Sequence, residues 1–273
     1  AGWGWAVSVA ALGFAVGGGV LPIRVVALMT GVAWRNLWVA AAAICLMGVP
    51  VLAWLLGKER TPAAFAETDT STGMEGRHWT RGQALANPLF WLMFPAILGP
   101  SAFNTAFFFH QVHFAGIKGW THVDLVAMFP LYTLMAVVAM VASGWLLDRL
   151  GTARLMPFYQ IPFAIGFLCF AYASGPAMMF LGFVFLAMST GANSTLPNAF
   201  WAEFYGTAHI GAIKAMAAAA MVLGSAIGPG LTGVLIDAGF GLESQYVAIA
   251  GYFVMTTTIM AVGISRAARR LPP

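Results

Sequence analysis

Long stretches without a charged side chain run through most of this chain and limit what it can fold into. Charged residues are absent from 1–23, 36–57, 82–117, 125–147, 155–202, 215–236 and 244–265. Because about 20 apolar residues suffice to cross the hydrocarbon core of a bilayer, each stretch is long enough for a membrane helix. Hydrophobic residues make up 60% of the chain and charged residues 8%, which excludes a soluble globular domain of this size.

The charge-free stretches predict an all-α integral membrane bundle with eight transmembrane helices. Residues 155–202 are long enough for two of them, and Ser174-Gly175-Pro176 marks the break between the two. Backbone polar groups in lipid must be satisfied inside each segment, so no other secondary structure is needed. We predict spans at 5–31, 36–57, 87–115, 123–147, 154–174, 177–202, 210–236 and 244–266.

Basic residues are concentrated on one side of these spans. With residues 58–86 placed in the cytoplasm, only Arg35 and Lys118 fall outside. The inside set is Lys58, Arg60, Arg77, Arg81, Arg149, Arg154, Lys214, Arg266, Arg269 and Arg270. This bias predicts a multi-pass protein of the cell (inner) membrane, with residues 58–86 and the C-terminus in the cytoplasm. The net charge of +4 then reflects contact with an anionic leaflet, and no nucleic-acid partner is expected.

One polar segment and one short repeat organise the chain. Residues 58–86 form the longest stretch of low hydrophobicity and separate two spans from six. Leu-Gly-Phe-Ala-Val-Gly-Gly-Gly at 12–19 returns as Leu-Gly-Ser-Ala-Ile-Gly-Pro-Gly at 223–230. Glycines four residues apart let two helix backbones approach closely, so both copies are predicted to be packing edges, with a hinge or leak-seal role as the alternative. A repeat of this kind favours a transporter built from duplicated halves.

A motif between two predicted spans carries a family resemblance. Residues 144–154 read Gly-Trp-Leu-Leu-Asp-Arg-Leu-Gly-Thr-Ala-Arg. With this motif the chain resembles the major facilitator superfamily, whose members carry Gly-x-x-x-Asp-Arg-x-Gly-x-basic-basic between the second and third helices of each six-helix half. Ala153 stands here at the first of the two basic positions. Residues 33–36 and 202–206 resemble further segments of the family, next to its sixth helix and between its tenth and eleventh helices.

The resemblance implies helices five to twelve of that family, in a fragment of a longer transporter. Residues 1–57 would be the last two helices of the N-terminal half, 58–86 the cytoplasmic connecting loop and 87–273 the C-terminal six-helix half. We expect 1–57 to dock beside that half through the glycine face of 13–17. The Gly-rich first span and Trp34-Arg35 resemble the monocarboxylate and oxalate–formate-like branch. Residues 125–147 nevertheless lack the Arg that members of that branch often place in the eighth helix.

The motif loop supplies candidate gating residues. Asp148 is expected near the N-terminal end of the helix that begins near Ile210, where the helix dipole is positive. Arg149 and Arg154 are expected to pair with Glu203. Such contacts would form in one state and break in the other, as alternating access requires. The alternative is that these charged side chains are simply solvated residues that flank the membrane helices. The gating candidates are Gly144, Asp148, Arg149, Gly151, Arg154 and Glu203.

Polar residues inside apolar spans are candidates for substrate binding, because each is costly in lipid. On the predicted span 87–115, steps of three and four residues place Ser101, Asn104, Phe108 and Gln111 on one face. On the span 177–202, the corresponding cluster is Thr190, Asn193 and Ser194, with Ser189 and Pro197 beside it. In the family that the chain resembles, these two helices line the central cavity. Interhelical hydrogen bonding for packing is the alternative for these residues.

Arg24 is the one formally charged residue well inside a predicted span, roughly 10 Å from the outer end of its helix at about 1.5 Å per residue. A guanidinium at that depth is stabilised by an anionic partner, so Arg24 is a further candidate for binding substrate. The alternative is that its side chain snorkels to the outer interface.

These features predict a secondary active transporter that moves a small solute, such as a carboxylate or another organic anion, by alternating access. Its partners would be that substrate, a coupled proton or counter-transported anion, and the lipid bilayer, and we predict a monomer. The sequence shows no catalytic motif, and Cys45 and Cys169 both fall inside spans, so we expect no enzyme activity, cofactor or metal site. The alternatives are a drug or metabolite efflux carrier of the same superfamily, or a non-transporting receptor or assembly subunit.

Overall fold

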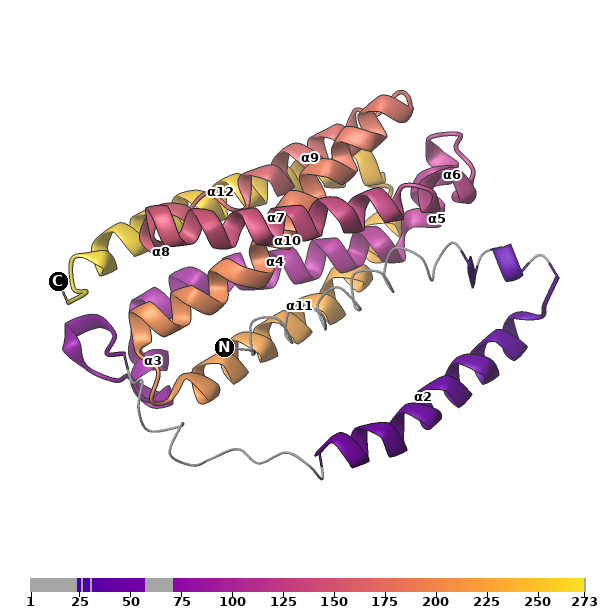
Figure 1. The fold of residues 1–273 in the computed structure, drawn as a ribbon. Coiled ribbons are helices and arrows are strands. Elements are labelled where there is room, and N and C mark those ends of the chain that lie inside the picture. Colours follow the sequence, from indigo (N-terminus) through magenta and orange to yellow (C-terminus); the bar gives the residue numbers. More distant parts are fainter. Residues whose placement is uncertain (1–23, 26, 30, 57–70, 273) are drawn as a thin grey trace.

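The computed structural model describes residues 24–25, 27–29, 31–56 and 71–272. Within these residues every regular element is helical, and six helices are long and apolar enough to cross a membrane. Most of these helices lie side by side in one elongated bundle, while α2 stands apart from it (Figure 1). The predicted all-α membrane bundle is therefore confirmed.

The elements of the described residues fall into two groups. The long helices are α2 (Trp34–Leu56), α4 (Pro88–Phe109), α7 (Phe129–Leu150), α10 (Pro176–Tyr205), α11 (Ile210–Asp237) and α12 (Leu242–Ala268). The short ones are η2 (Met74–Gly76), α3 (Arg81–Ala86), α5 (Gln111–Ile117), α6 (His122–Val126), α8 (Thr152–Leu155) and α9 (Ile161–Ala171). Helices α6 and α7 together make one candidate span, His122–Leu150.

Local sequence determines where several helices begin and end. The Asn87 side chain accepts a hydrogen bond from the Leu89 amide, and Pro88 occupies the first turn, so α4 begins at the position these residue types favour. Helices α7 and α10 stop at Gly151 and Gly206, whose φ angles of 76° and 77° are readily adopted only by glycine. Two sharp turns at the same end of the bundle therefore depend on glycine.

The predicted spans agree with the observed helices over most of their length, although a break at His110 separates α4 from α5 and a break at residues 127–128 separates α6 from α7. Long helices occupy the predicted spans 36–57, 87–115, 123–147, 177–202, 210–236 and 244–266, while the span 5–31 lies almost wholly outside the described residues. The prediction of one helix over 154–174 is wrong, because turns at residues 156–160 divide it into α8 and α9. Pro157 lies within that turn and Pro162 in the first turn of α9, and neither can donate the backbone hydrogen bond that a continuous helix needs.

The bundle is built from two groups of three helices. Helix α10 packs mainly against α7 and α9, and α4 packs mainly against α11 and α12. Helices α9 and α12 join the two groups, whereas α10 and α11 touch only sparingly. Two clusters of buried side chains fill the bundle, one near α3 and the other, rich in phenylalanine, near α5 and α6. We call the first end, which carries Arg81, Arg149, Arg154 and Arg266, the basic end.

Glycines allow the closest helix contacts in the described bundle. A Cβ atom at Gly224 would lie 2.6 Å from the Leu98 carbonyl oxygen of α4, and one at Gly228 would overlap the carbonyl of Ala102. The second copy of the repeat is therefore a packing edge between α11 and α4, as predicted. The first copy, residues 12–19, lies outside the described residues.

Helix α2 does not pack against the bundle. Residues Trp34–Trp54 form an apolar stretch in which no residue is buried, and α2 runs alone beside the bundle in Figure 1. The expected docking of residues 1–57 is thus not seen for α2, and Gly13 and Gly17 lie outside the described residues. A helix that is apolar on all sides is satisfied by lipid and needs no protein neighbour.

The second part of the predicted connecting loop is packed rather than extended. Trp79 is buried, its amide donates to the Tyr205 carbonyl at 2.9 Å, and its indole donates to the Met74 carbonyl at 3.1 Å. A Cβ atom at Gly73 would lie 2.5 Å from the Phe204 carbonyl oxygen, so the chain passes directly over the end of α10. Low average hydrophobicity concealed the buried Met74 and Trp79, which fix residues 71–86 to the basic end.

Candidate functional site

A cavity of about 500 Å³ lies where α10 and α11 diverge, and we call it the α10–α11 cavity. Helix α4 contributes Ile97, and Tyr159 precedes α9. Along α10 the lining runs from Thr190 to Trp201, or about 16 Å at 1.5 Å per residue. The full lining is Ile97, Tyr159, Thr190, Asn193, Ser194, Pro197, Asn198, Trp201, Lys214, Ala217, Ala218 and Met221. The three polar residues predicted on this helix therefore share one cavity.

The hydroxyl groups of this cavity are already occupied. Thr190 donates to the Leu186 carbonyl at 2.9 Å and accepts from the Tyr132 hydroxyl at 3.1 Å. Ser194 donates to the Gly191 carbonyl at 2.6 Å. Bonds of this kind to the preceding turn are common for Ser and Thr in helices. Neither hydroxyl is thus a free donor in this conformation.

Asn193 and Lys214 supply the free donors of the α10–α11 cavity. The Asn193 amide is half-buried and has no hydrogen-bond partner among the described residues. Lys214, one turn into α11, is exposed at the basic end and forms no ion pair within the described chain. Of the residues that the structure describes, no acidic side chain lines this cavity. The arrangement presents two hydrogen-bond donors, one of them cationic, to a solute.

The polar face predicted on α4 does not line the α10–α11 cavity but lies close to it. Phe108 packs edge to face against Tyr132, with ring centres 5.4 Å apart. The Asn104 side chain is a further hydrogen-bonding neighbour of the Tyr132 hydroxyl, which itself reaches Thr190. The carbonyl oxygens of Asn104 and Gln111 are buried without a partner in the described chain, and Ser101 is half-buried. Tyr132, which the sequence analysis did not single out, connects the two predicted polar faces.

A buried polar network next to the cavity stabilises α4 where Pro100 interrupts its backbone hydrogen bonds. Pro100 has no amide hydrogen, so the Ala96 carbonyl one turn earlier lacks its usual helical donor. The Tyr159 hydroxyl donates to that carbonyl at 3.3 Å, and the Gln160 amide also donates to it. Thr256 of α12 donates to the Gln160 side-chain oxygen at 2.7 Å. Prolines inside an apolar span indicate in the sequence that some backbone carbonyls need other hydrogen-bond donors, as this network provides.

The motif residues lie at the basic end, around the turn that joins α7 to α8. Gly151 ends α7, and the Arg149 guanidinium lies 4.0 Å from the centre of the Trp145 ring. Asp148 is exposed, and no hydrogen bond or ion pair joins its side chain to α11 in the described chain. Gly144 lies within α7 and is half-buried, whereas Arg154 lies in α8 and is exposed.

The expected pairing of Glu203 with Arg149 or Arg154 is not formed in this structure. Instead Glu203 borders a separate cavity of about 410 Å³ together with Ser71, Thr72 and Pro272. Among the described residues the ion pairs at this end are those of Glu75 with Arg77 and Arg270.

Other sequence candidates lie away from the cavity. Arg24 is exposed and belongs to a short helical segment before α2. Within the described residues no group of His, Cys, Asp and Glu side chains is arranged to hold a metal ion.

Comparison with known proteins agrees with this architecture. A search of the curated proteins finds no match to the chain. The family model of the Major Facilitator Superfamily matches residues 3–229 and, in a second and overlapping match, residues 127–273. Members of that family are multi-pass membrane transporters that bind small-molecule substrates. Because the matches extend over most of its length, the chain belongs to the Major Facilitator Superfamily.

Proposed function

We propose that this transporter moves a small organic anion, such as a carboxylate, which binds in the α10–α11 cavity. The observation that carries the proposal is that the Asn193 amide and the Lys214 ammonium line the same cavity. Neither has a hydrogen-bond or ion-pair partner among the described residues, and no acidic side chain of those residues lines the cavity. An anion would receive one charge-assisted and one neutral hydrogen bond there. A cationic solute would meet only repulsion from Lys214.

Lys214 and Asn193 would have different roles at the two ends of the cavity. Lys214 lies near the basic end and would attract the anion as it enters or leaves. Asn193 lies deeper, beside Thr190 and Tyr159, and would orient the rest of the solute. A coupled proton or a counter-transported anion would complete the cycle of alternating access, and Arg24 remains a proposed second cation for the same substrate.

Uptake of a panel of radiolabelled organic acids, sugars and cationic drugs into vesicles containing the full-length protein tests the substrate class. We expect saturable uptake of one or more organic anions and none of the cations. Preference for a neutral or cationic solute would instead favour the efflux-carrier alternative. Binding without uptake would favour the non-transporting receptor.

Replacement of Lys214 tests its role directly. Lys214→Gln should raise KM for the anion about tenfold, the factor that about 1.4 kcal/mol produces and within the range of a hydrogen bond to a charged group. Arg266→Gln removes an exposed cation at the same end but outside the cavity, so it should leave KM unchanged. Equal KM values for the two variants would rule out Lys214 as a substrate contact.

A further inference from the structure

A second groove lies on the opposite side of α11 from the α10–α11 cavity. It has a volume of about 410 Å³ and is formed by α3, α4 and α11. At about 100° per residue, Ala215, Ala219 and Leu223 lie roughly opposite Lys214, Ala218 and Met221 on the α11 helix. Its lining is Arg81, Leu85, Phe90, Trp91, Phe94, Ala212, Ala215, Met216, Ala219, Ala220 and Leu223. We call it the α3–α11 groove.

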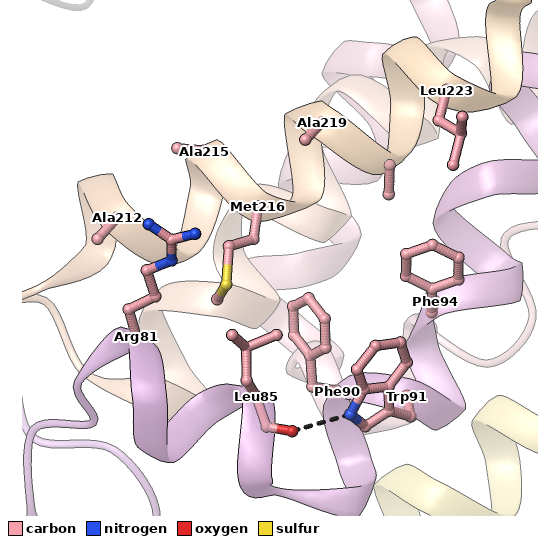
Figure 2. A pocket seen from close by; sticks show the side chains of 11 residues that line it. Arg81, Leu85, Phe90, Trp91, Phe94, Ala212, Ala215, Met216, Ala219 and Leu223 are labelled. Carbon is pink, nitrogen blue, oxygen red and sulfur yellow. Dashed lines mark hydrogen bonds between the residues drawn. The ribbon is translucent and has the colours of Figure 1, made fainter.

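Apart from Arg81, the walls of the α3–α11 groove are apolar. Figure 2 shows the alanines of α11 on one side and the rings of Phe90, Trp91 and Phe94 on the other. Met216 and Leu223 are the longer side chains on the α11 side, and Figure 2 shows Met216 extending from α11 into the groove. The indole of Trp91 donates to the Leu85 carbonyl at 2.8 Å, so its polar atom is already satisfied and its ring remains available for apolar contact.

The length of the groove matches one leaflet of a bilayer. From Ala212 to Leu223 the α11 wall is about 16 Å long at 1.5 Å per residue. Half of the roughly 30 Å hydrocarbon core is about 15 Å. A chain of methylene groups lying along α11 would therefore stay in contact with the groove through the whole of its own leaflet.

One charge stands at the basic end of this groove. Arg81 extends from α3 toward the first turns of α11, beside Ala212 and Ala215 (Figure 2). The Arg81 side chain is exposed and forms no ion pair in the described part of the chain. The lining that the described residues provide contains no acidic side chain. A guanidinium in this position matches the geometry of a phosphate group.

We propose that the α3–α11 groove is a binding site for one anionic phospholipid, with an acyl chain along α11 and the headgroup phosphate on Arg81. The lipid would connect α3, in the packed connector, with α4 and α11 of the bundle. This site is separate from the α10–α11 cavity, and its occupancy is measured without any transport assay.

Lipid retention by the full-length protein tests the proposal. Purified protein is equilibrated with an equimolar mixture of phosphatidylglycerol and phosphatidylcholine of identical acyl chains, passed over a sizing column, and the retained lipids are quantified by mass spectrometry. We expect phosphatidylglycerol to be retained preferentially. Arg81→Gln should reduce its retention about fivefold, the scale of one basic residue at an anionic membrane surface. The matched control is Arg269→Gln, which removes an exposed cation outside the groove and should change nothing.

A second variant blocks the apolar part without touching the charge. Ala215→Phe with Ala219→Phe adds rings to two exposed positions of α11 and should also abolish preferential retention. Equal losses in the Arg81 and Arg269 variants, or equal retention of the two lipids by the unaltered protein, would overturn the proposal. A photo-crosslinker at position 219 that captures a peptide, from this chain or another copy, would also overturn it by identifying a protein occupant.

Discussion

At the residue scale, Gln160 is the side chain on which the buried network most depends. Its amide donates to the carbonyl that Pro100 leaves unpaired, and its oxygen accepts from Thr256. Gln160→Leu should therefore lower the free energy of unfolding by about 1–2 kcal/mol, because two buried groups lose a partner. The midpoint of thermal unfolding in detergent measures this loss.

Gln111 provides the matched control for this residue. Its side-chain oxygen is buried without a hydrogen-bond partner in the described chain. Gln111→Leu should therefore be neutral or stabilising, since it removes an unsatisfied polar group. If the two variants unfold at the same temperature, the network does not stabilise α4 as argued.

At the element scale, the contact between α11 and α4 depends on the absence of a side chain at Gly228. A Cβ atom there would overlap the Ala102 carbonyl, so Gly228→Ala should force the helices apart and destabilise the protein by about 1–3 kcal/mol. At Gly230, two residues further along α11, a Cβ atom meets nothing within 4 Å. Gly230→Ala should be neutral or stabilising by up to about 1 kcal/mol, because alanine favours the helix. Thermal unfolding of the two variants side by side would disprove this account if Gly228→Ala were the more stable.

At the scale of the whole molecule, the exposed motif turn is proposed to bias the equilibrium between two conformations. The Asp148 side chain has no hydrogen-bond or ion-pair partner among the described residues, so its contact with the start of α11 would form only in another state. Asp148→Asn should slow transport several-fold without changing the amount of protein in the membrane, because one charge at a helix end contributes up to about 1 kcal/mol. Initial uptake rates, normalised to membrane protein, measure the effect.

The control for this whole-molecule prediction is Asp237→Asn. Asp237 is likewise exposed but ends α11 at the opposite end of the bundle. Its replacement should leave uptake unchanged. Wild-type uptake kinetics in the Asp148 variant would show that Asp148 is only a solvated residue beside a membrane helix, with no effect on the conformational equilibrium.

The sequence by itself determined the helices and most of their bounds, because apolar length, capping residues and chain-breaking glycines and prolines act within a few neighbouring residues. It also placed Thr190, Asn193 and Ser194 together, since helical periodicity is a local property. Only the tertiary structure decided that Lys214 shares their cavity, that Tyr132 and Tyr159 adjoin it, and that Glu203 faces the connector. Those relations join residues far apart in the chain, and they depend on which helices pack against each other. Because each helix is apolar on nearly every face, the hydrophobic pattern does not specify which helices pack against each other.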